Sequence, residues 1–235
     1  MEDKKTTNYF DNFTTPVFPV ARYSHTIDTI NRYCQPGASL IDIGCGNGNT
    51  LQFIRDNTPV EKLVGMDVSK NYLAQVNERL RCDTALGSIL DSHCIATMGN
   101  KFDFAVMGAV LHHLVGRTRK ESRRRAKQAI KNALQLLKNG GHLIIYEPVF
   151  YPSWLMSIVF YLKSFMTRLT SGRAQLFAKW ANIGMPVVSF YTNEQLIEMI
   201  DETAKAELIG KEIKDSRQLA FIICRTKTTL VIRKV

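Results

Sequence analysis

Alternating glycines and two acidic residues are the features of this sequence with the clearest chemical meaning. Gly44, Gly46 and Gly48 stand at every second position within Leu40 to Asn49, and Asp42 precedes the first of them by two residues. Glycine lacks a Cβ, so a ligand can lie directly against such a turn. Asp67 follows about twenty residues later, where a carboxylate can accept hydrogen bonds from both ribose hydroxyls. The pattern predicts a nucleotide-binding turn.

The spacing and charge of this turn distinguish between nucleotides. A dinucleotide fingerprint reads G-x-G-x-x-G and holds pyrophosphate at a helix N-terminus, whereas this turn reads G-x-G-x-G after an acid. A carboxylate at Asp42 would repel phosphate. It would favour a cationic ligand, such as the amino-acid end of S-adenosylmethionine with its ammonium and sulfonium groups.

Two adjacent histidines are the candidate catalytic residues. His112 and His113 follow the apolar run Phe102 to Met107, and histidine can accept a proton near neutral pH. Methyl transfer displaces an already activated sulfonium, so a base would add only about 10²- to 10⁴-fold. The alternative is that both histidines only pack or hold the loop. Glu147 is a further candidate that could orient a substrate hydroxyl or amine.

Short apolar runs alternate with helical patterns from residue 39 to residue 147, which predicts a parallel sheet with helices on both faces. The expected class is α/β, doubly wound, with seven mostly parallel strands, an antiparallel last strand and a helical cap insertion. A helix is expected over Glu121 to Leu137, ended by glycines. The first five strands are expected at Ser39 to Ile43, Lys62 to Asp67, Asp83 to Gly87, Phe102 to Met107 and Gly141 to Glu147.

One domain of 235 residues is expected, with four successive parts. Residues 1–38 would form a helical preamble containing Tyr9 and Tyr23, and residues 39–147 the cofactor-binding core. Residues 148–191 would form a helical cap. Residues 192–235 would supply a last helix over 192–203 and two strands, 206–214 and 218–225, joined by a turn at 214–217.

Several of these segments resemble the successive motifs of class I S-adenosylmethionine-dependent methyltransferases, in particular those of types 11 and 12. They are Asp42 to Gly48, Asp67, Phe102 to Leu114 and Leu136 to Glu147. The resemblance implies S-adenosylmethionine as donor and S-adenosylhomocysteine as product, and it makes His112 the better candidate base. By the same resemblance, the cofactor would contact Tyr23, Asp42, Ile43, Gly44, Cys45, Gly46, Asp67, Val68, Ser88, Ile89, Met107 and Gly108.

No metal is expected, because hard cations need several oxygen ligands and Met107-Gly108, at a strand end, offers no carboxylate. The family often has Gly-Asp after the third strand, whereas this chain has Gly87-Ser88, which makes the adenine contact of Ser88 less certain.

The aromatic and apolar segment 150–169 is too short to span a bilayer, and it predicts either a cap over the site or an interfacial helix. A cap points to a small hydrophobic or aromatic acceptor; an interfacial helix points to a lipid or quinone and to peripheral membrane contact. The third interpretation is that segment 150–169 only packs on the core.

The net charge of +10 and the basic run Arg117 to Lys127 leave an RNA acceptor as a second alternative. No nucleic-acid-binding module accompanies the run, so RNA ranks below a small molecule. A third alternative is a scaffold protein that binds the cofactor without catalysing a reaction. Five cysteines without a C-x-x-C pair and a polar N-terminus predict a cytoplasmic location.

Overall fold

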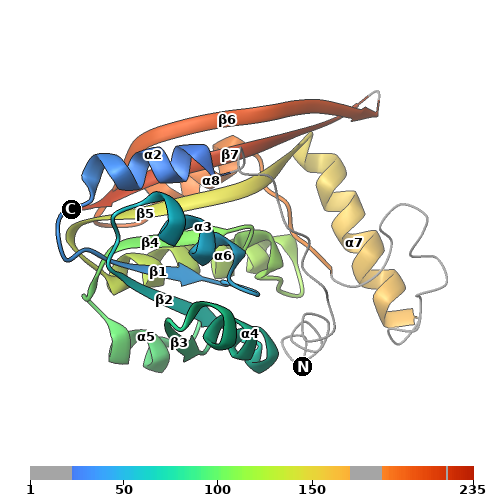
Figure 1. Cartoon of the computed structure of the whole chain (residues 1–235). Helices are drawn as coiled ribbons and strands as arrows, with labels where there is room; N and C mark the ends of the chain where they lie inside the picture. The colour runs from blue at the N-terminus through green and yellow to red at the C-terminus, as the bar shows by residue number, and fades with distance from the viewer. Residues whose placement is uncertain (1–22, 170–186, 221) are drawn as a thin grey trace.

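The computed structural model describes residues 23–169, 187–220 and 222–235, which form one sheet between two layers of helices (Figure 1). The strands are β1 (Ser39–Ile43), β2 (Lys62–Asp67), β3 (Asp83–Leu86), β4 (Phe102–Gly108), β5 (Leu137–Tyr151), β6 (Ala206–Ala220) and β7 (Ile223–Lys234). The helices are α2 (Ser24–Tyr33), α3 (Asn49–Asn57), α4 (Lys70–Leu80), α5 (Ser92–Met98), η2 (Leu111–His113), α6 (Arg119–Leu136), α7 (Ser153–Leu169) and α8 (Asn193–Asp201).

The seven strands lie in the order β3-β2-β1-β4-β5-β7-β6. The first five pair in parallel, and β7 runs antiparallel to both of its neighbours. This confirms the predicted fold class. Because the chain moves outward from β1 to β3 and then returns to place β4 on the other side of β1, the strand order reverses between β1 and β4. Ligands of such sheets bind at the carboxyl ends of the strands at this point.

Alternate residues of the central strands fill two separate cores. Leu40, Phe104 and Ile144 face the layer of α2, α3 and α4, whereas Ile41 and Ala105 face the layer of α5, α6 and α8. Strand β1 is buried along its whole length, as expected for a central strand covered on both faces. The sheet is therefore a rigid platform for the loops at its edge.

Two helices begin where side chains satisfy free backbone N–H groups. Thr118 accepts a hydrogen bond from the Glu121 N–H before α6, and Thr192 forms a capping box with Gln195 before α8. The observed starts lie within two residues of those predicted for the two helices.

Strand β5 is longer than predicted at both ends. It runs from Leu137 to Tyr151, so the predicted boundary between core and cap at residue 147 is wrong. The reason is pairing: residues His142 to Tyr151 lie in unbroken antiparallel register with β7. Helix α7 follows at Ser153, and residues 170–186 of the predicted cap lie outside the described residues.

The closing hairpin is also longer than predicted. Strands β6 and β7 continue to Ala220 and from Ile223, so the connection lies at 221–222 and the turn predicted at 214–217 is wrong. Asp215 has a left-handed backbone (φ 52°) and forms a bulge, in which one extra residue of β6 lies between Lys214 and Arg217. The residue types at 214–217 that predicted a turn therefore lie at a bulge within β6.

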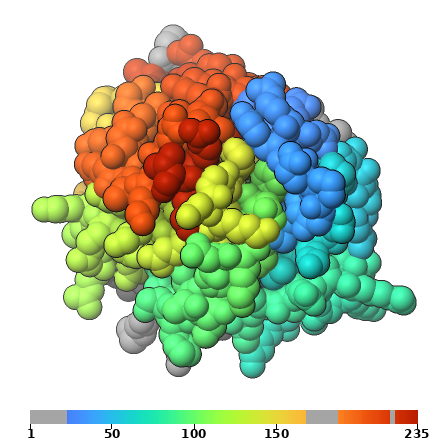
Figure 2. All heavy atoms as spheres, turned by 90° about the vertical axis from the view of Figure 1, so that its left-hand side faces the viewer, coloured from blue at the N-terminus to red at the C-terminus, as the bar shows by residue number. Residues whose placement is uncertain are grey.

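Helix α2 confirms a helix in the predicted preamble, and residues 1–22, with Tyr9, lie outside the described residues. The C-terminal end of the helix lies near the amino ends of the parallel strands, where the ring of Tyr33 stacks on His142 at 4.3 Å. Figure 2 looks at this end, with α2 in blue beside the start of β5 in yellow and the C-terminal strands in orange and red.

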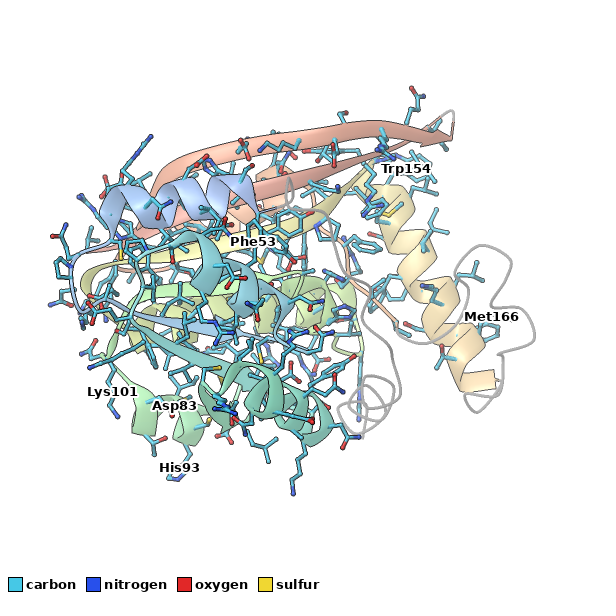
Figure 3. The ribbon with its side chains drawn as sticks, viewed as in Figure 1. Phe53, Asp83, His93, Lys101, Trp154 and Met166 are labelled. Atoms are coloured by element: carbon cyan, nitrogen blue, oxygen red, sulfur yellow. The ribbon has the colours of Figure 1, made fainter. Side chains whose placement is uncertain are left out.

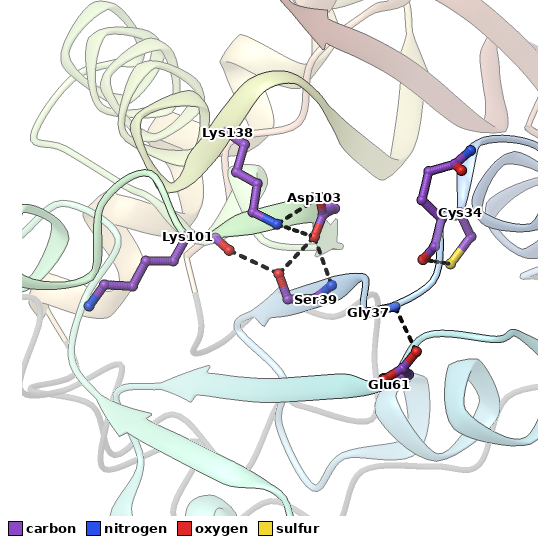
Figure 4. Close-up of polar contacts among 8 residues, drawn as sticks. Cys34, Gly37, Ser39, Glu61, Lys101, Asp103 and Lys138 are labelled. Carbon is purple, nitrogen blue, oxygen red and sulfur yellow. Dashed lines mark hydrogen bonds and ion pairs between the residues drawn. The ribbon is translucent and has the colours of Figure 1, made fainter.

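A polar cluster ties the amino ends of β1, β4 and β5 together (Figure 4). Asp103 accepts hydrogen bonds from the Ser39 N–H (2.8 Å) and from the Lys138 ammonium (2.8 Å). Burial would raise the pKa of Asp103, but these hydrogen bonds outweigh it and lower the pKa below its usual value. In Figure 3, Lys101 and Asp83 lie at this end, far from Trp154 and Met166 on α7, which flanks the opposite end.

Candidate active site

The glycine turn lies over the carboxyl ends of β1 and β2. The backbone N–H groups of Gly44 and Cys45 both donate to the Met66 carbonyl, at 2.7 and 3.0 Å. Gly44, Gly46 and Gly48 have φ values of 72°, 53° and 80°, which are left-handed conformations. The turn then leads directly into α3. The predicted role of the glycines as a tight, close-approach turn therefore agrees with their backbone geometry.

Asp67 fixes the turn from the neighbouring strand. Its Oδ2 accepts a hydrogen bond from the Gly46 N–H and its Oδ1 accepts one from the Ser69 N–H, both at 2.9 Å. The side chain is 8% exposed. A carboxylate offers about four acceptor sites, so these two hydrogen bonds alone do not exhaust the acceptor capacity of Asp67.

Asp42 is a buried acid beside this carboxylate. It is 2% exposed, and its Oδ2 has no hydrogen-bond partner among the described residues. Burial, together with the charge of Asp67, raises the pKa of Asp42 to about 7. A buried acceptor without a partner is costly unless a donor or a cation completes it. The site thus has the electrostatic character expected for a cationic ligand.

Four of the predicted cofactor residues direct their side chains into the two cores. Ile43, Cys45, Ile89 and Met107 are each at most 6% exposed. They can therefore contact a ligand only through the main chain. Gly108 differs, because a Cβ added there would meet no atom within 4 Å.

Of the remaining three predicted cofactor residues, Val68 and Ser88 lie nearer the surface, whereas Tyr23 is buried. Val68 is 40% exposed after β2, and half-buried Ser88 accepts a hydrogen bond from the Leu90 N–H (3.2 Å). Tyr23 lies over the start of α3, with its hydroxyl 3.5 Å from Thr50 Oγ1 and its ring 5.4 Å from the ring of Phe53. Phe53 lies near the middle of the molecule in Figure 3.

His112 and Glu147 form a buried pair where β4 and β5 end. His112 Nδ1 lies 2.6 Å from Glu147 Oε2, and Glu147 Oε1 accepts a hydrogen bond from the Leu111 N–H at 2.6 Å. With an ionised Glu147 and a neutral imidazole, Nδ1 donates this hydrogen bond and Nε2 carries the lone pair. The sequence reasoning placed Glu147 at this rim but did not predict that it orients His112.

His113 stacks on His112, with ring centroids 4.1 Å apart. Burial lowers the pKa of His113 well below its usual value, and electrostatic interactions with His112 and Lys163 lower it further. His113 therefore stays neutral at physiological pH and is poorly suited to hold a proton.

Residues 187–192 lie against this pair and were not predicted to do so. The Ser189 N–H donates to the His112 carbonyl (2.8 Å), and the ring of Phe190 stacks on His112 at 5.2 Å. Arg119 holds the segment by donating to Ser189 Oγ (2.9 Å) and to the Phe190 carbonyl. Because Arg119 is one of several basic residues between Arg117 and Lys127, sequence reasoning did not single it out.

Comparisons with known proteins agree with this geometry. Residues 41–143 match the family model described as a methyltransferase domain. Over 88% of this chain and 97% of the other, the fold superposes on a S-adenosylmethionine-dependent methyltransferase from Methanosarcina mazei, with a TM-score of 0.62 and 16% identity. Residues 41–143 therefore belong to a methyltransferase domain, and the fold is that of class I methyltransferases.

Sequence relatives of the methyltransferase domain have diverse names. The chain is 32% identical over 110 residues to a tRNA (carboxymethyluridine(34)-5-O)-methyltransferase of Xenopus tropicalis, covering 47% of this chain and 15% of that protein. It is 33% identical over 64 residues to a trans-aconitate 2-methyltransferase of Acidovorax ebreus, covering 27% of this chain and 25% of that protein. The chain spans less than half of the length of the curated relatives it matches.

A solved geranyl diphosphate methyltransferase, in complex with GPP and sinefungin, also shares the fold. Its TM-score is 0.64 at 10% identity, over 100% of this chain and 99% of that one.

Three of the seven basic residues in the run Arg117 to Lys127 form ion pairs with acids. On α6, Arg123 pairs with Glu198 at 2.7 Å and Lys127 pairs with Glu202 at 3.0 Å. Arg125 pairs with Glu121 and donates to the Val115 carbonyl. These contacts attach α6 to α8 and to the loop before it, which weakens the case for α6 as a phosphate-binding surface.

In residues 23–169, 187–220 and 222–235, no three His, Cys, Asp or Glu side chains lie close enough together to hold a metal ion. The absence of a metal stays a prediction. None of the helices in the same ranges is long and apolar enough to cross a membrane.

Gly44→Ala tests the close packing of the glycine turn. A Cβ at Gly44 would lie 2.7 Å from Val110 Cγ2, at a left-handed φ of 72°. We expect the substitution to lower the free energy of unfolding by about 1–3 kcal/mol, measured by urea denaturation. Val110→Ala in the same chain should recover part of this loss. A purely additive double mutant would contradict the clash.

Proposed function

We propose that the protein transfers a methyl group from S-adenosylmethionine to an oxygen, nitrogen or carbon atom of a small acceptor with an apolar body. The observation that carries the donor assignment is Asp42, a buried acid with an unpartnered oxygen, beside Asp67 at the point where the strand order reverses. When bound, S-adenosylmethionine supplies a methyl group on a sulfonium that a nucleophile can displace.

The residues at the strand ends fit this cofactor. Asp42, with the main chain of Ile43, Gly44, Cys45 and Gly46, would hold the methionine part. The carboxylate of Asp67, with Val68, would accept the ribose hydroxyls. Ser88 and the main chain at Ile89 would border the adenine, and Met107-Gly108 would lie under the sulfonium. Tyr23 would cover the cofactor from α2.

His112 is the proposed base. Glu147 accepts the proton-bearing Nδ1 and thereby leaves Nε2 available to accept a proton from the acceptor. Glu147 also favours the imidazolium that would form, since an adjacent carboxylate stabilises a positive charge. His113 would assist only by packing on the ring of His112.

An apolar acceptor is supported by the aromatic surroundings of the pair. Phe190 stacks on His112, and the Phe150 ring lies 4.2 Å from the Phe190 ring. Rings of this kind exclude water and bind apolar groups. Nearby, α7 exposes five large apolar side chains, which supports peripheral membrane contact through 150–169 as a route to lipid-like acceptors; they are Trp154, Ile158, Tyr161, Leu162 and Phe165.

RNA is the second candidate acceptor, because the chain has a net charge of +10 and resembles a tRNA methyltransferase. The ion pairs of Arg123, Arg125 and Lys127 count against it. An RNA acceptor would require binding that weakens steeply with salt.

A labelling experiment tests the proposal. Purified protein is given S-adenosylmethionine with a labelled methyl group, together with small-molecule, lipid and RNA fractions of its host. We expect label in a small-molecule or lipid fraction, with at least about tenfold less label for Asp42→Asn at pH 8 and a cofactor concentration below the wild-type Kd. Label confined to RNA, or cofactor binding without turnover in any fraction, would contradict the proposed acceptor or the proposed activity, respectively.

A further inference from the structure

Arg225 on β7 is a cation whose buried Nε lacks a hydrogen-bond acceptor among the described residues. Its side chain is half-buried, and no ion pair joins it to another described residue. Its guanidinium lies 5.8 Å from the centre of the Phe150 ring. A buried N–H group that no acceptor completes is unfavourable, and an anion held by the planar fork of the guanidinium would complete it.

Like charges surround Arg225 on the same face of the β6–β7 hairpin. Arg217 stands directly opposite Arg225, and Lys214 stands directly opposite Lys227 two residues further along β7. Directly opposed like charges destabilise a sheet. The neighbouring acid, Asp215, pairs with Lys227. Asp215 also interacts electrostatically with Arg217 and Arg225, so one carboxylate is shared among several cations and positive charge is in excess at this part of the described hairpin.

Aromatic rings connect Arg225 to the His112–Glu147 pair. Phe150 is paired with Arg225 across β5 and β7, the Phe190 ring lies 4.2 Å from the Phe150 ring, and the His112 ring lies 5.2 Å from the Phe190 ring. A continuous apolar path thus runs from the proposed base to the guanidinium of Arg225 at the rim.

We propose that Arg225 binds the anionic head of an amphipathic acceptor whose apolar body lies along Phe150 and Phe190. This rests on the proposed function, since it names the acceptor class for the same site. The head would be a phosphate or a carboxylate, the groups that match the guanidinium fork with two parallel hydrogen bonds. Such a head can belong to a free metabolite or to a lipid.

Calorimetric binding of octyl phosphate to the full-length protein, with S-adenosylhomocysteine present, tests the proposal. We expect octyl phosphate to bind, and octanol and octyltrimethylammonium to bind at least tenfold more weakly. Arg225→Gln should weaken octyl phosphate binding about 10- to 100-fold, as for the loss of a charge-assisted hydrogen-bonded pair. Arg217→Gln, with the same change of charge on an exposed neighbour, should stay within about threefold.

Equal binding of octanol and octyl phosphate, or equal losses in the two variants, would overturn the proposal. Affinity for S-adenosylhomocysteine is measured for each variant and should not change, which separates this proposal from the donor assignment and detects misfolding. Vesicles with and without phosphatidylglycerol identify the source of the head. Binding to anionic vesicles that is lost in Arg225→Gln indicates a lipid, and binding of monomeric octyl phosphate alone indicates a free metabolite.

Discussion

His112→Ala is expected to lower kcat about 10²- to 10⁴-fold for a hydroxyl acceptor, with little change in cofactor affinity. The reason is that Nε2 of His112 is the lone pair that Glu147 leaves available beside the strand ends. The measurement is single-turnover methyl transfer on the acceptor found by labelling, together with calorimetric binding of S-adenosylhomocysteine.

Glu147→Gln sharpens the same prediction. A glutamine amide in this place would donate to Nδ1, which would move the histidine proton to Nε2 and remove the base, while the amide oxygen could still accept from the Leu111 N–H. We expect a loss of kcat of the same order in a protein that still folds. His113→Ala, the matched control, should cost much less. If His112→Ala kept kcat within threefold, the pair would only hold the loop.

Asp42→Asn is expected to have opposite effects on stability and on cofactor binding. Because the pKa of Asp42 is raised to about 7 in the folded protein, the folded state holds a proton that the unfolded chain releases near pH 4. The free energy of unfolding of the wild type therefore falls as pH rises from about 4 to about 7 and is level above this range. Asparagine does not ionise, so Asp42→Asn should raise the free energy of unfolding by up to about 4 kcal/mol at pH 8 in the absence of cofactor.

Cofactor affinity should depend on the ionisation of Asp42 in the opposite sense to stability, rising as the pH rises. A cation favours ionised Asp42, so wild-type affinity for S-adenosylmethionine should rise up to tenfold per pH unit below about 7 and then level off. Asp42→Asn should flatten this profile and weaken binding about 10- to 100-fold at pH 8. Urea denaturation and calorimetry across pH 5.5–8.5 measure both effects. A variant with wild-type affinity and an unchanged pH profile would show that Asp42 does not face the cation.

The donor side of the site could be predicted from the sequence, because local patterns determine it. Glycines in a strand-to-helix turn, an acid before them and Asp67 at the next strand end depend on short segments whose places follow from the parallel sheet. The parallel core of the sheet followed from the alternation of apolar runs with helical patterns.

The acceptor side could not be predicted, because it depends on contacts between distant segments. Glu147 meets His112 across 35 residues, and Arg119 meets Phe190 across 71. The extension of β5 comes from its pairing with β7, which no local pattern of β5 reveals. Bulges and turns use similar residue types. The sequence around Asp215 therefore predicts a turn, whereas the strand pairing shows a bulge.

The clamp of Asp67 on Gly46 and Ser69 has an evolutionary consequence. It holds the proposed methionine- and ribose-binding part of the site together through β1 and β2, whereas residues 187–192 and the β6–β7 hairpin build much of the proposed acceptor side. Substitutions in residues 187–192 and in the hairpin leave these two hydrogen bonds untouched. On the proposed function, a lineage carrying this chain can therefore change which molecule it methylates while inheriting its methyl source intact.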